Sequence, residues 1–331
     1  MLLFWIIVFI ISLTFLVKGA DWLIIYAEKI GLALGLSSFI IGITIVALGT
    51  SFPELISSLV AVFKGITDIP VANALGSNIA NIFLVVGLCA LIGKRLVVTK
   101  NLIDLDLPLL AAGTVLSLGI IWDKQVTLGE SILMIVAYSI YLLYTVLHQD
   151  TDSEPENLET LPSRQKRRKK ITPRKENKIS RPKLTIKDFL MLLLGVGALS
   201  FGAKYLIDAV INLSISLNIS TGAIAITAVA FGTSLPELLV SVKAALQKKS
   251  EIALGNIFGS NLFNILIVIG LPGLFKTLSV DNQTFAVGVP AMALATLLFV
   301  ISGISKRIHL WEGAFFICLY ILFIIKLFNW F

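Results

Sequence analysis

Long apolar runs separated by short polar breaks occupy almost the whole chain. Each run is close to, or longer than, the roughly 20 residues that a helix needs to cross about 30 Å of membrane hydrocarbon. No run alternates apolar and polar positions as the strands of an outer-membrane barrel do, so the runs predict helices. Ten runs are counted, at residues 2–25, 37–63, 70–92, 101–121, 126–147, 184–212, 219–246, 252–273, 284–303 and 309–330. The pattern predicts an all-α integral membrane protein with ten transmembrane helices.

Composition agrees with this class and excludes several others. Of the 331 residues 57% are hydrophobic and 14% are charged, which is more apolar surface than a soluble domain of this length needs. The first residues lack the basic start and cleavage site of a signal peptide, so residues 1–17 are expected to belong to the first span. Cys89 and Cys318 lie inside apolar runs, and no cluster with the two His residues predicts a zinc or redox site. The sequence contains no nucleophile–base pair, phosphate loop or metal triad that would indicate an enzyme. No cofactor is expected.

One long polar segment, residues 148–183, interrupts the apolar pattern. It opens with acidic residues, turns basic over residues 163–170, and supplies most of the net charge of +7. No aromatic residues interleave with its charges, so a linker near anionic lipid headgroups is favoured over a nucleic-acid site. The chain is therefore divided into a first half (1–147), a linker (148–183) and a second half (184–331).

The basic residues of the loops predict the orientation. With the N-terminus outside, the loops facing the cytoplasm carry eight Lys and Arg residues even without the linker, against three in the opposite loops. Such a bias is typical of the cytoplasmic face of a cell-membrane protein. Both termini are expected to be extracellular and the linker cytoplasmic.

The two halves repeat each other. Residues 47–88 align without a gap on residues 230–271, and 19 of the 42 positions are identical. The identities include Gly49/Gly232, Thr50/Thr233, Ser51/Ser234, Pro53/Pro236, Glu54/Glu237, Asn73/Asn256, Gly76/Gly259, Ser77/Ser260, Asn78/Asn261 and Asn81/Asn264. Because each half holds five spans, an odd number, the second half enters the membrane from the opposite side. The sequence thus predicts two inverted five-helix repeats, an architecture of secondary transporters.

Both repeats place a glutamate directly after a proline inside an apolar run. Intramembrane carboxylates are costly and mark functional sites by default, so Glu54 and Glu237 are the first candidates. Pro53 cannot donate to the carbonyl four residues earlier, and a carbonyl released at membrane depth requires a polar partner. Oxygen-bearing residues accompany them: Thr50, Ser51, Ser77 and Asn81 in the first half, and Thr233, Ser234, Ser260 and Asn264 in the second. Oxygen donors with two negative charges are the ligands that hard cations prefer.

Two groups of polar residues have a plainer interpretation. Asn73 and Asn256 serve equally well to join two helices as to line a site. Lys18 and Asp21 lie toward the end of the predicted first span, where charges at the membrane interface are expected.

The segments "GTSFPE" and "GTSLPE", each followed by "GSNIANI" or "GSNLFNI", closely resemble the two alpha repeats of the sodium/calcium exchangers. These belong to the cation/calcium exchanger superfamily, and the short linker resembles that of prokaryotic members. The resemblance implies an antiporter for Na⁺ and Ca²⁺ that works by alternating access, with no partner beyond these ions and the bilayer. It implies a calcium site at Glu54 and Glu237 with help from Thr50 and Thr233. It also implies sodium sites formed by Ser51, Ser77, Ser234, Ser260 and the carbonyls of Ala47 and Ala230. Asn81 and Asn264 would line the centre.

The resemblance leaves the counter-ion to be decided. Potassium-dependent relatives carry Asp where this chain has Asn264, so the site holds two carboxylates and potassium independence is expected. Three Na⁺ for one Ca²⁺, the exchange ratio of the family, would move one net charge per cycle. A Ca²⁺/H⁺ antiporter and a K⁺-dependent Na⁺/Ca²⁺ exchanger of the same superfamily are the alternatives.

Overall fold

The structure, a computed structural model, describes residues 2–93, 95–97, 106–147, 182–216, 234–305 and 307–327. The first half contains α1 (Leu2–Ala33), α2 (Ser38–Ile41), η1 (Gly42–Val46), α3 (Ala47–Phe63), α4 (Ile69–Ile79), η2 (Ala80–Val86), α5 (Gly87–Gly93), β1 (Arg95–Val97), α6 (Leu107–Ile120), η4 (Ile121–Asp123), β2 (Gln125–Val126) and α7 (Leu128–Leu147). The second half contains α8 (Ile186–Ser216), α10 (Leu235–Leu246), α11 (Ser250–Phe263), η5 (Asn264–Val268), α12 (Gly270–Gly273), β3 (Leu278–Ser279), η6 (Thr284–Gly288), α13 (Val289–Ile304), β4 (Arg307–His309) and α14 (Leu310–Leu327).

The helices follow the predicted apolar runs. Within the described residues, eight helical stretches are long and apolar enough to cross a membrane, and Leu107–Asp123 is a shorter apolar helix. Of the predicted span 219–246, the structure describes α10 and Ser234 before it, and the rest lies outside the described residues. The helical membrane protein is confirmed, while the count of ten spans stays a prediction.

Four short π-helical segments, which the apolar pattern does not predict, interrupt these helices. They are η1, η2, η5 and η6. Segments of this kind occur mostly inside α-helices and often at functional sites. Asn81 is the second residue of η2 and Asn264 is the first residue of η5, so each of these two π segments has a predicted site residue in its first turn.

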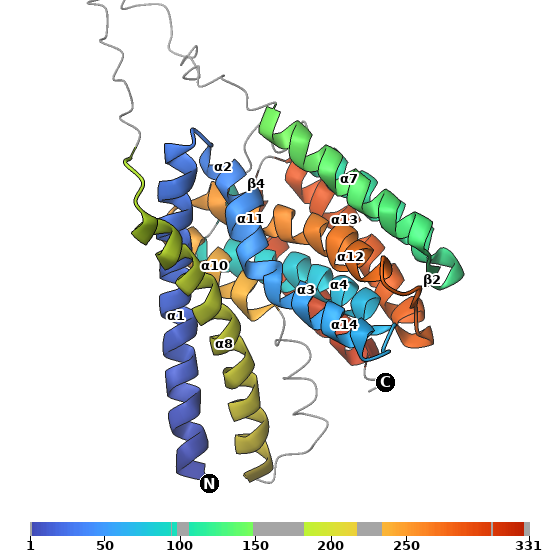
Figure 1. Cartoon of the computed structure of the whole chain (residues 1–331), viewed down its shortest axis with the longest axis horizontal. Helices are drawn as coiled ribbons and strands as arrows, with labels where there is room; N and C mark the ends of the chain where they lie inside the picture. The colour runs from blue at the N-terminus through green and yellow to red at the C-terminus, as the bar shows by residue number, and fades with distance from the viewer. Residues whose placement is uncertain are drawn as a thin grey trace, which may run out of the picture.

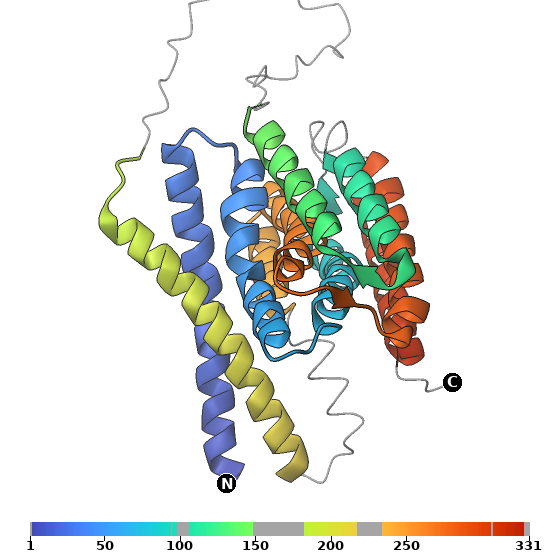
Figure 2. The ribbon, with the colours of Figure 1, turned by 45° about the vertical axis from the view of Figure 1, so that its right-hand side comes forward.

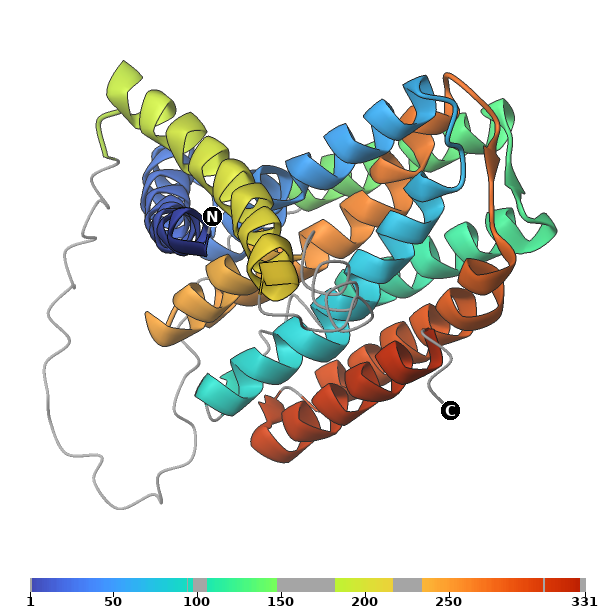
Figure 3. The same cartoon turned by 90° about the horizontal axis from the view of Figure 1, so that it is seen from below.

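The described part of the molecule consists of a helix bundle and a crossing pair of helices packed against it. α1 and α8 lie side by side on one edge, and their lower ends in Figures 1 and 2 reach past the other helices. The view from below places α13 and α14, in red, at the opposite edge (Figure 3). The helical stretch Ser250–Gly273 lies between these edges and is the most deeply buried of the candidate spans, whereas α1 is largely exposed. The centre of the fold is therefore formed by α11 and the elements around it.

Two small antiparallel ribbons join the halves. β1 pairs with β4, with Leu96 opposite Ile308, and β2 pairs with β3, with Val126 opposite Leu278. Each ribbon takes one strand from the first half and one from the second. The two halves are thus held together by these strand pairs in addition to the packing of the buried helices.

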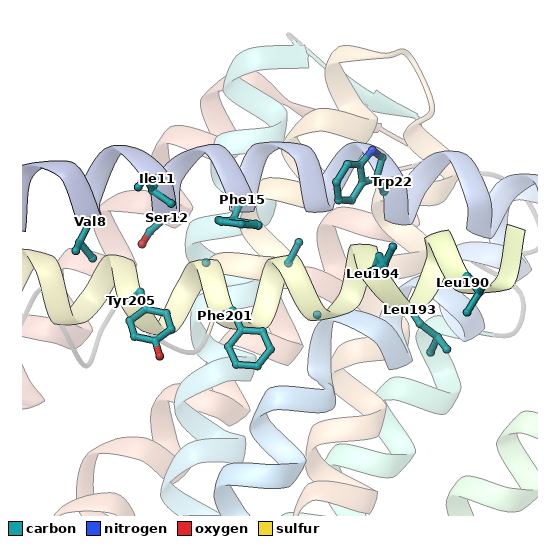
Figure 4. Close-up of a pocket in the computed structure, with 13 residues that line it drawn as sticks. Val8, Ile11, Ser12, Phe15, Trp22, Leu190, Leu193, Leu194, Phe201 and Tyr205 are labelled. Atoms are coloured by element: carbon teal, nitrogen blue, oxygen red, sulfur yellow. The ribbon is translucent and has the colours of Figure 1, made fainter. Parts of the chain in front are cut away.

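A groove of about 680 Å³ lies between α1 and α8. Figure 4 shows it lined by apolar and aromatic side chains, among them Phe15, Trp22, Leu193 and Phe201. No carboxylate lines it, so this groove is not the predicted cation site.

The first helix is longer than the sequence predicts. α1 runs to Ala33 and not to residue 25, so Lys18 and Asp21 lie near its middle. The expectation that both residues sit at the end of a span is wrong. Asp21 has a different environment, because it forms an ion pair with Lys243 of α10.

Candidate cation-binding site

A close crossing of two helices builds the centre of the site. A Cβ on Gly255 would lie 2.5 Å from the carbonyl oxygen of Phe39, and a Cβ on Gly259 would lie 2.2 Å from that of Ile43. Gly42 meets α11 in the same way, 2.7 Å from the carbonyl oxygen of Ile252. Backbones can approach this closely only where side chains are absent, as at small-residue contacts between membrane helices. The crossing brings the start of α3 against the middle of α11.

The two predicted glutamates are both inside the protein. Glu54 of α3 is 0% exposed and Glu237 of α10 is 1% exposed. Ser51 Oγ donates a hydrogen bond of 2.9 Å to Glu237 Oε1, so a residue of the first repeat contacts the carboxylate of the second. Both Oε atoms of Glu54 and Oε2 of Glu237 are buried without a hydrogen-bond partner among the described residues.

The two predicted central amides are buried in the same manner. Asn81 and Asn264 are each 0% exposed. Neither the Oδ1 nor the Nδ2 atom of either side chain has a hydrogen-bond partner in the part of the chain that the structure describes. A buried polar atom left without a partner costs about 1–3 kcal/mol, so several together require an explanation in function.

Thr50 connects α3 to α11 through its hydroxyl group. The Thr50 Oγ1 atom donates to Asn256 Oδ1 at 3.0 Å and lies 3.3 Å from Ser260 Oγ. It also lies 3.3 Å from the carbonyl oxygen of Ala47, one of the carbonyls that the resemblance assigns to a sodium site. The structure thus brings Thr50, Ser260 and the Ala47 carbonyl together.

The alternative role of Asn73 and Asn256 receives direct support. Asn73 Nδ2 donates to Ser58 Oγ at 3.2 Å, and Asn256 Nδ2 donates to Ser241 Oγ at 2.9 Å. These hydrogen bonds occupy equivalent positions in the two repeats. Asn73 also donates to the carbonyl oxygen of Glu54 at 3.2 Å, so it orients the helix turn that carries the glutamate. Both asparagines join helices beside the site.

A second pair of asparagines was missed as site residues by sequence reasoning. Asn78 and Asn261 are fully buried, and Asn78 Nδ2 donates to the backbone carbonyl of Asn261 at 2.8 Å. Equivalent positions of the two repeats therefore touch each other. Their identity in the aligned "GSN" segments was the available signal, but it does not show that the two segments meet.

The remaining predicted residues are placed as follows. Ser77 of α4 is 3% exposed, and Ser234, directly before α10, is 4% exposed. Ala230 and Thr233 lie outside the described residues. Pro53 lies within α3, whereas Pro236 lies in the first turn of α10.

The chemistry of the site is that of hard cations. Its donors are carboxylate, hydroxyl, amide and carbonyl oxygens, and the two glutamates carry the only formal charges among them. Ca²⁺ takes six to eight oxygen ligands of these kinds. Two carboxylates without a counter-charge are strongly destabilised in a dry interior, and a bound cation removes that cost. No group of three or more His, Cys, Asp or Glu residues occurs within the described ranges, so a transition-metal centre finds no support there.

Comparison with known proteins agrees with this geometry. The family described as "Sodium/calcium exchanger protein" matches the chain over residues 4–147 and again over 187–329. A relative named sodium/calcium exchanger MaX1, from Methanosarcina acetivorans, is 32% identical and covers 97% of this chain and 97% of its own length. An uncharacterised membrane protein of Methanocaldococcus jannaschii is also 32% identical, over 96% of both chains.

The fold is likewise similar to a solved one. The structure of a sodium/calcium exchanger from Methanococcus jannaschii matches with a TM-score of 0.80 and 29% identity, over 98% of each chain. These matching proteins are membrane transporters and not enzymes. The chain belongs to the sodium/calcium exchanger protein family.

Proposed function

We propose that this protein is a secondary active antiporter that exchanges Na⁺ for Ca²⁺ across the cell membrane. The observation that carries the proposal is the buried pair Glu54 and Glu237, with three carboxylate oxygens that no described residue satisfies. A divalent cation between them matches their two negative charges. The names of the relatives and of the similar solved structure support calcium and sodium as the two ions.

The ions are assigned to neighbouring groups of one site. Glu54 and Glu237 hold Ca²⁺ with oxygen atoms of Thr50 and Thr233. The hydroxyl-bearing residues and carbonyls around them form the sodium positions, with the central amides between: Ser51, Ser77, Ser234, Ser260, Ala47, Ala230, Asn81 and Asn264. The Ser51–Glu237 hydrogen bond supports this division, because a sodium ligand in contact with a calcium ligand makes the two occupancies exclude each other.

The transport cycle rests on two inverted repeats, residues 1–147 and 184–331. Three features support this organisation. The family match falls into two segments of similar length. The bonds Asn73–Ser58 and Asn256–Ser241 are equivalent in the two halves, and both ribbons pair a strand of one half with a strand of the other. Such repeats support alternating access, in which the site opens to one side of the membrane at a time.

The charge count gives the expected coupling. One Ca²⁺ neutralises the two glutamates, whereas three Na⁺ leave the site with a charge of +1. Exchange of three Na⁺ for one Ca²⁺ is therefore electrogenic. With Asn264 in place of a third carboxylate, the site has no further charge to hold K⁺.

Sodium-driven calcium uptake tests the proposal. Purified protein is reconstituted in sealed vesicles loaded with Na⁺, and uptake of labelled Ca²⁺ is followed after dilution into Na⁺-free buffer. Uptake that requires the outward Na⁺ gradient is expected. Uptake driven by a proton gradient alone would favour a Ca²⁺/H⁺ antiporter, and uptake that also requires K⁺ would favour a K⁺-dependent exchanger.

A further inference from the structure

Every ion pair in the described part of the chain has one partner on α1. Lys29 pairs with Asp188 at 2.6 Å, Asp21 with Lys243 at 2.5 Å, and Glu28 with Lys249 at 2.5 Å. The Lys243 Nζ atom also donates to the carbonyl oxygen of Val17 at 2.6 Å. Lys243 therefore holds α1 by its backbone as well as by a side chain.

The three pairs do not connect the same elements. Lys29–Asp188 joins α1 to α8 and is internal to the crossing pair seen in Figures 1 and 2. Asp21–Lys243 joins α1 to α10, the helix of Glu237, and Glu28–Lys249 joins α1 to the residue before α11, the helix of Ser260. We call these last two pairs the α1 clamp, because they connect α1 to the elements that carry the site.

Elsewhere the face that α1 buries is apolar. Leu16, Leu23 and Ile24 are fully buried there, and a Cβ on Gly19 would lie 2.8 Å from the backbone nitrogen of Leu199 in α8. Apolar contact is non-directional, so it holds two helices together without fixing one register between them. Ion pairs with defined donor and acceptor positions do fix a register. The contact at Gly19 joins α1 to α8, whereas the clamp joins α1 to α10 and to the α10–α11 connection. The clamp thus distinguishes one position of α1 relative to the helices of the site from another.

The clamp also breaks the internal repeat. At the offset of 183 residues, Asp21 corresponds to Lys204 and Lys243 to Val60, while Glu28 corresponds to Ile211 and Lys249 to Ile66. The first half therefore offers no equivalent partners to α8. In the orientation that the loop charges predict, the connection after α10 faces the cytoplasm. The clamp then lies toward the cytoplasmic side, because α10 ends at Leu246, just after Lys243, and Lys249 is in that connection.

We infer that the α1 clamp holds α1 against α10 and α11 on the cytoplasmic side and biases the exchanger toward the state closed on that side. The inference rests on the alternating-access function proposed above. Asp21, Glu28, Lys243 and Lys249 are positioning residues, since they touch no ion site directly. A bias between two states lowers the apparent affinity at the disfavoured face by the fraction of molecules that are competent there. The clamp thus makes the cytoplasmic face the weaker side for Ca²⁺.

The test compares the two faces of the membrane. Vesicles with the protein in known orientation are used to measure the Ca²⁺ concentration for half-maximal exchange at each face. Asp21→Asn, Lys243→Gln, Glu28→Gln and Lys249→Gln are each expected to lower that concentration at the cytoplasmic face and raise it at the extracellular face. A shift of about twofold to fivefold corresponds to one partly exposed ion pair. The double variant D21K/K243D, which restores the pair with its charges exchanged, should return both values toward those of the unmodified protein.

Lys29→Gln is the matched control. It removes an ion pair of similar length from the same helix, but this pair is internal to α1 and α8. The two faces should keep their original half-maximal concentrations. A clamp variant that shifts both faces in the same direction, or neither, would overturn the inference while sodium-driven uptake persists, and so would a charge-exchanged variant without recovery. Loss of sodium-driven uptake in the unmodified protein would instead overturn the proposed function, and the clamp with it.

Discussion

Glu54 and Glu237 differ from the acidic residues that serve stability. Glu130, in the first turn of α7, accepts hydrogen bonds from the backbone nitrogen and hydroxyl group of Thr127, each at 2.8 Å. Glu54 is buried, yet neither carboxylate oxygen has such a partner among the described residues. This difference supports the proposal that the Glu54 carboxylate serves a ligand and not the fold.

Glutamine at either buried position is expected to abolish calcium transport. Glu54→Gln or Glu237→Gln keeps the size and shape of the side chain but removes one of the two negative charges that face the divalent ion. At 4 Å and an effective dielectric constant of about 20, a unit charge pair is worth about 4 kcal/mol, or roughly a thousandfold in affinity. Calcium uptake in vesicles is the measurement, and Glu130→Gln is the control that should retain transport. Transport by both site variants at the normal rate would contradict the assignment.

Ser51 is expected to affect sodium more than calcium. Ser51→Ala removes the 2.9 Å hydrogen bond to Glu237 together with a proposed sodium ligand. The Na⁺ concentration for half-maximal drive should rise several-fold, with a smaller change for Ca²⁺. Ser139→Ala is a suitable control, because among the described residues Ser139 bonds only to the carbonyl oxygen of Ile135 in its own helix. A change confined to Ca²⁺ would argue against a sodium position at Ser51.

Sequence reasoning selected the two glutamates that the structure buries, but not all of their polar neighbours. A carboxylate directly after a proline in an apolar run is easily recognised in the sequence alone, and its recurrence in both repeats strengthens the signal. The contact between Asn78 and the Asn261 carbonyl joins positions 183 residues apart, so it appears only once both halves are folded together. Asp21 was misplaced because the end of an apolar run is not the end of α1. The helix continues beyond residue 25 to Ala33 through Glu28 and Lys29, whose charges find partners on the α10–α11 connection and on α8.

At the scale of elements, the crossing of η1 with α11 decides whether the site assembles. Gly259→Ala would place a methyl group 2.2 Å from the Ile43 carbonyl oxygen and 2.6 Å from the Ala47 Cβ atom, so one helix must move. Overpacking of this kind costs about 1–3 kcal/mol. Lower thermal stability and loss of calcium uptake are expected together.

The repeat supplies the control for this substitution. Gly76 occupies the position equivalent to Gly259, but nothing lies within 4 Å of a Cβ placed there. Alanine is favoured over glycine in a helix interior by roughly 0.5–1 kcal/mol, so Gly76→Ala should be neutral or stabilising. The melting temperature in detergent measures both variants. Equal effects at Gly76 and Gly259 would show that the close crossing does not set the helix position.

Pro53 is expected to matter through the carbonyl that it leaves free. α3 continues through Pro53, whose ring nitrogen cannot donate to the Gly49 carbonyl. Pro53→Ala restores that hydrogen bond, so the protein should stay folded with equal or higher stability. Sodium dependence of calcium uptake should weaken, because a backbone oxygen near the sodium positions is withdrawn. Unchanged sodium dependence would contradict this role.

The π segments show why the apolar pattern of the sequence cannot predict every boundary within a helix. The apolar runs 37–63, 70–92 and 252–273 each read as one continuous helix, and each contains a π segment. An additional residue in one turn leaves no mark on an apolar pattern. It does rotate the residues on either side, which is how the helix that begins at Ser250 can turn Asn264 inward and still pack along its length.

At the scale of the whole molecule, the charge of the site determines how exchange responds to potassium and to voltage. The side chains of Asn81 and Asn264 are neutral amides. The proposed site therefore carries two negative charges, one from each glutamate. A neutral amide can supply an oxygen atom but adds no charge to hold a further monovalent cation. Sodium-driven calcium uptake is therefore expected to be indifferent to K⁺. Replacing K⁺ by a bulky inert cation, with the potential clamped, measures this.

With the proposed ratio of three Na⁺ to one Ca²⁺, membrane potential is expected to drive the exchange. With three Na⁺ leaving for each Ca²⁺ entering, one positive charge leaves a Na⁺-loaded vesicle per cycle. Moving one charge across 100 mV is worth about 2.3 kcal/mol, so a positive potential inside the vesicle should accelerate uptake and a negative potential should slow it. The potential is set by an ionophore for an ion that the protein does not transport. Uptake insensitive to potential would show that two Na⁺ exchange for one Ca²⁺, and that the carboxylates at Glu54 and Glu237 are neutralised equally by either cargo.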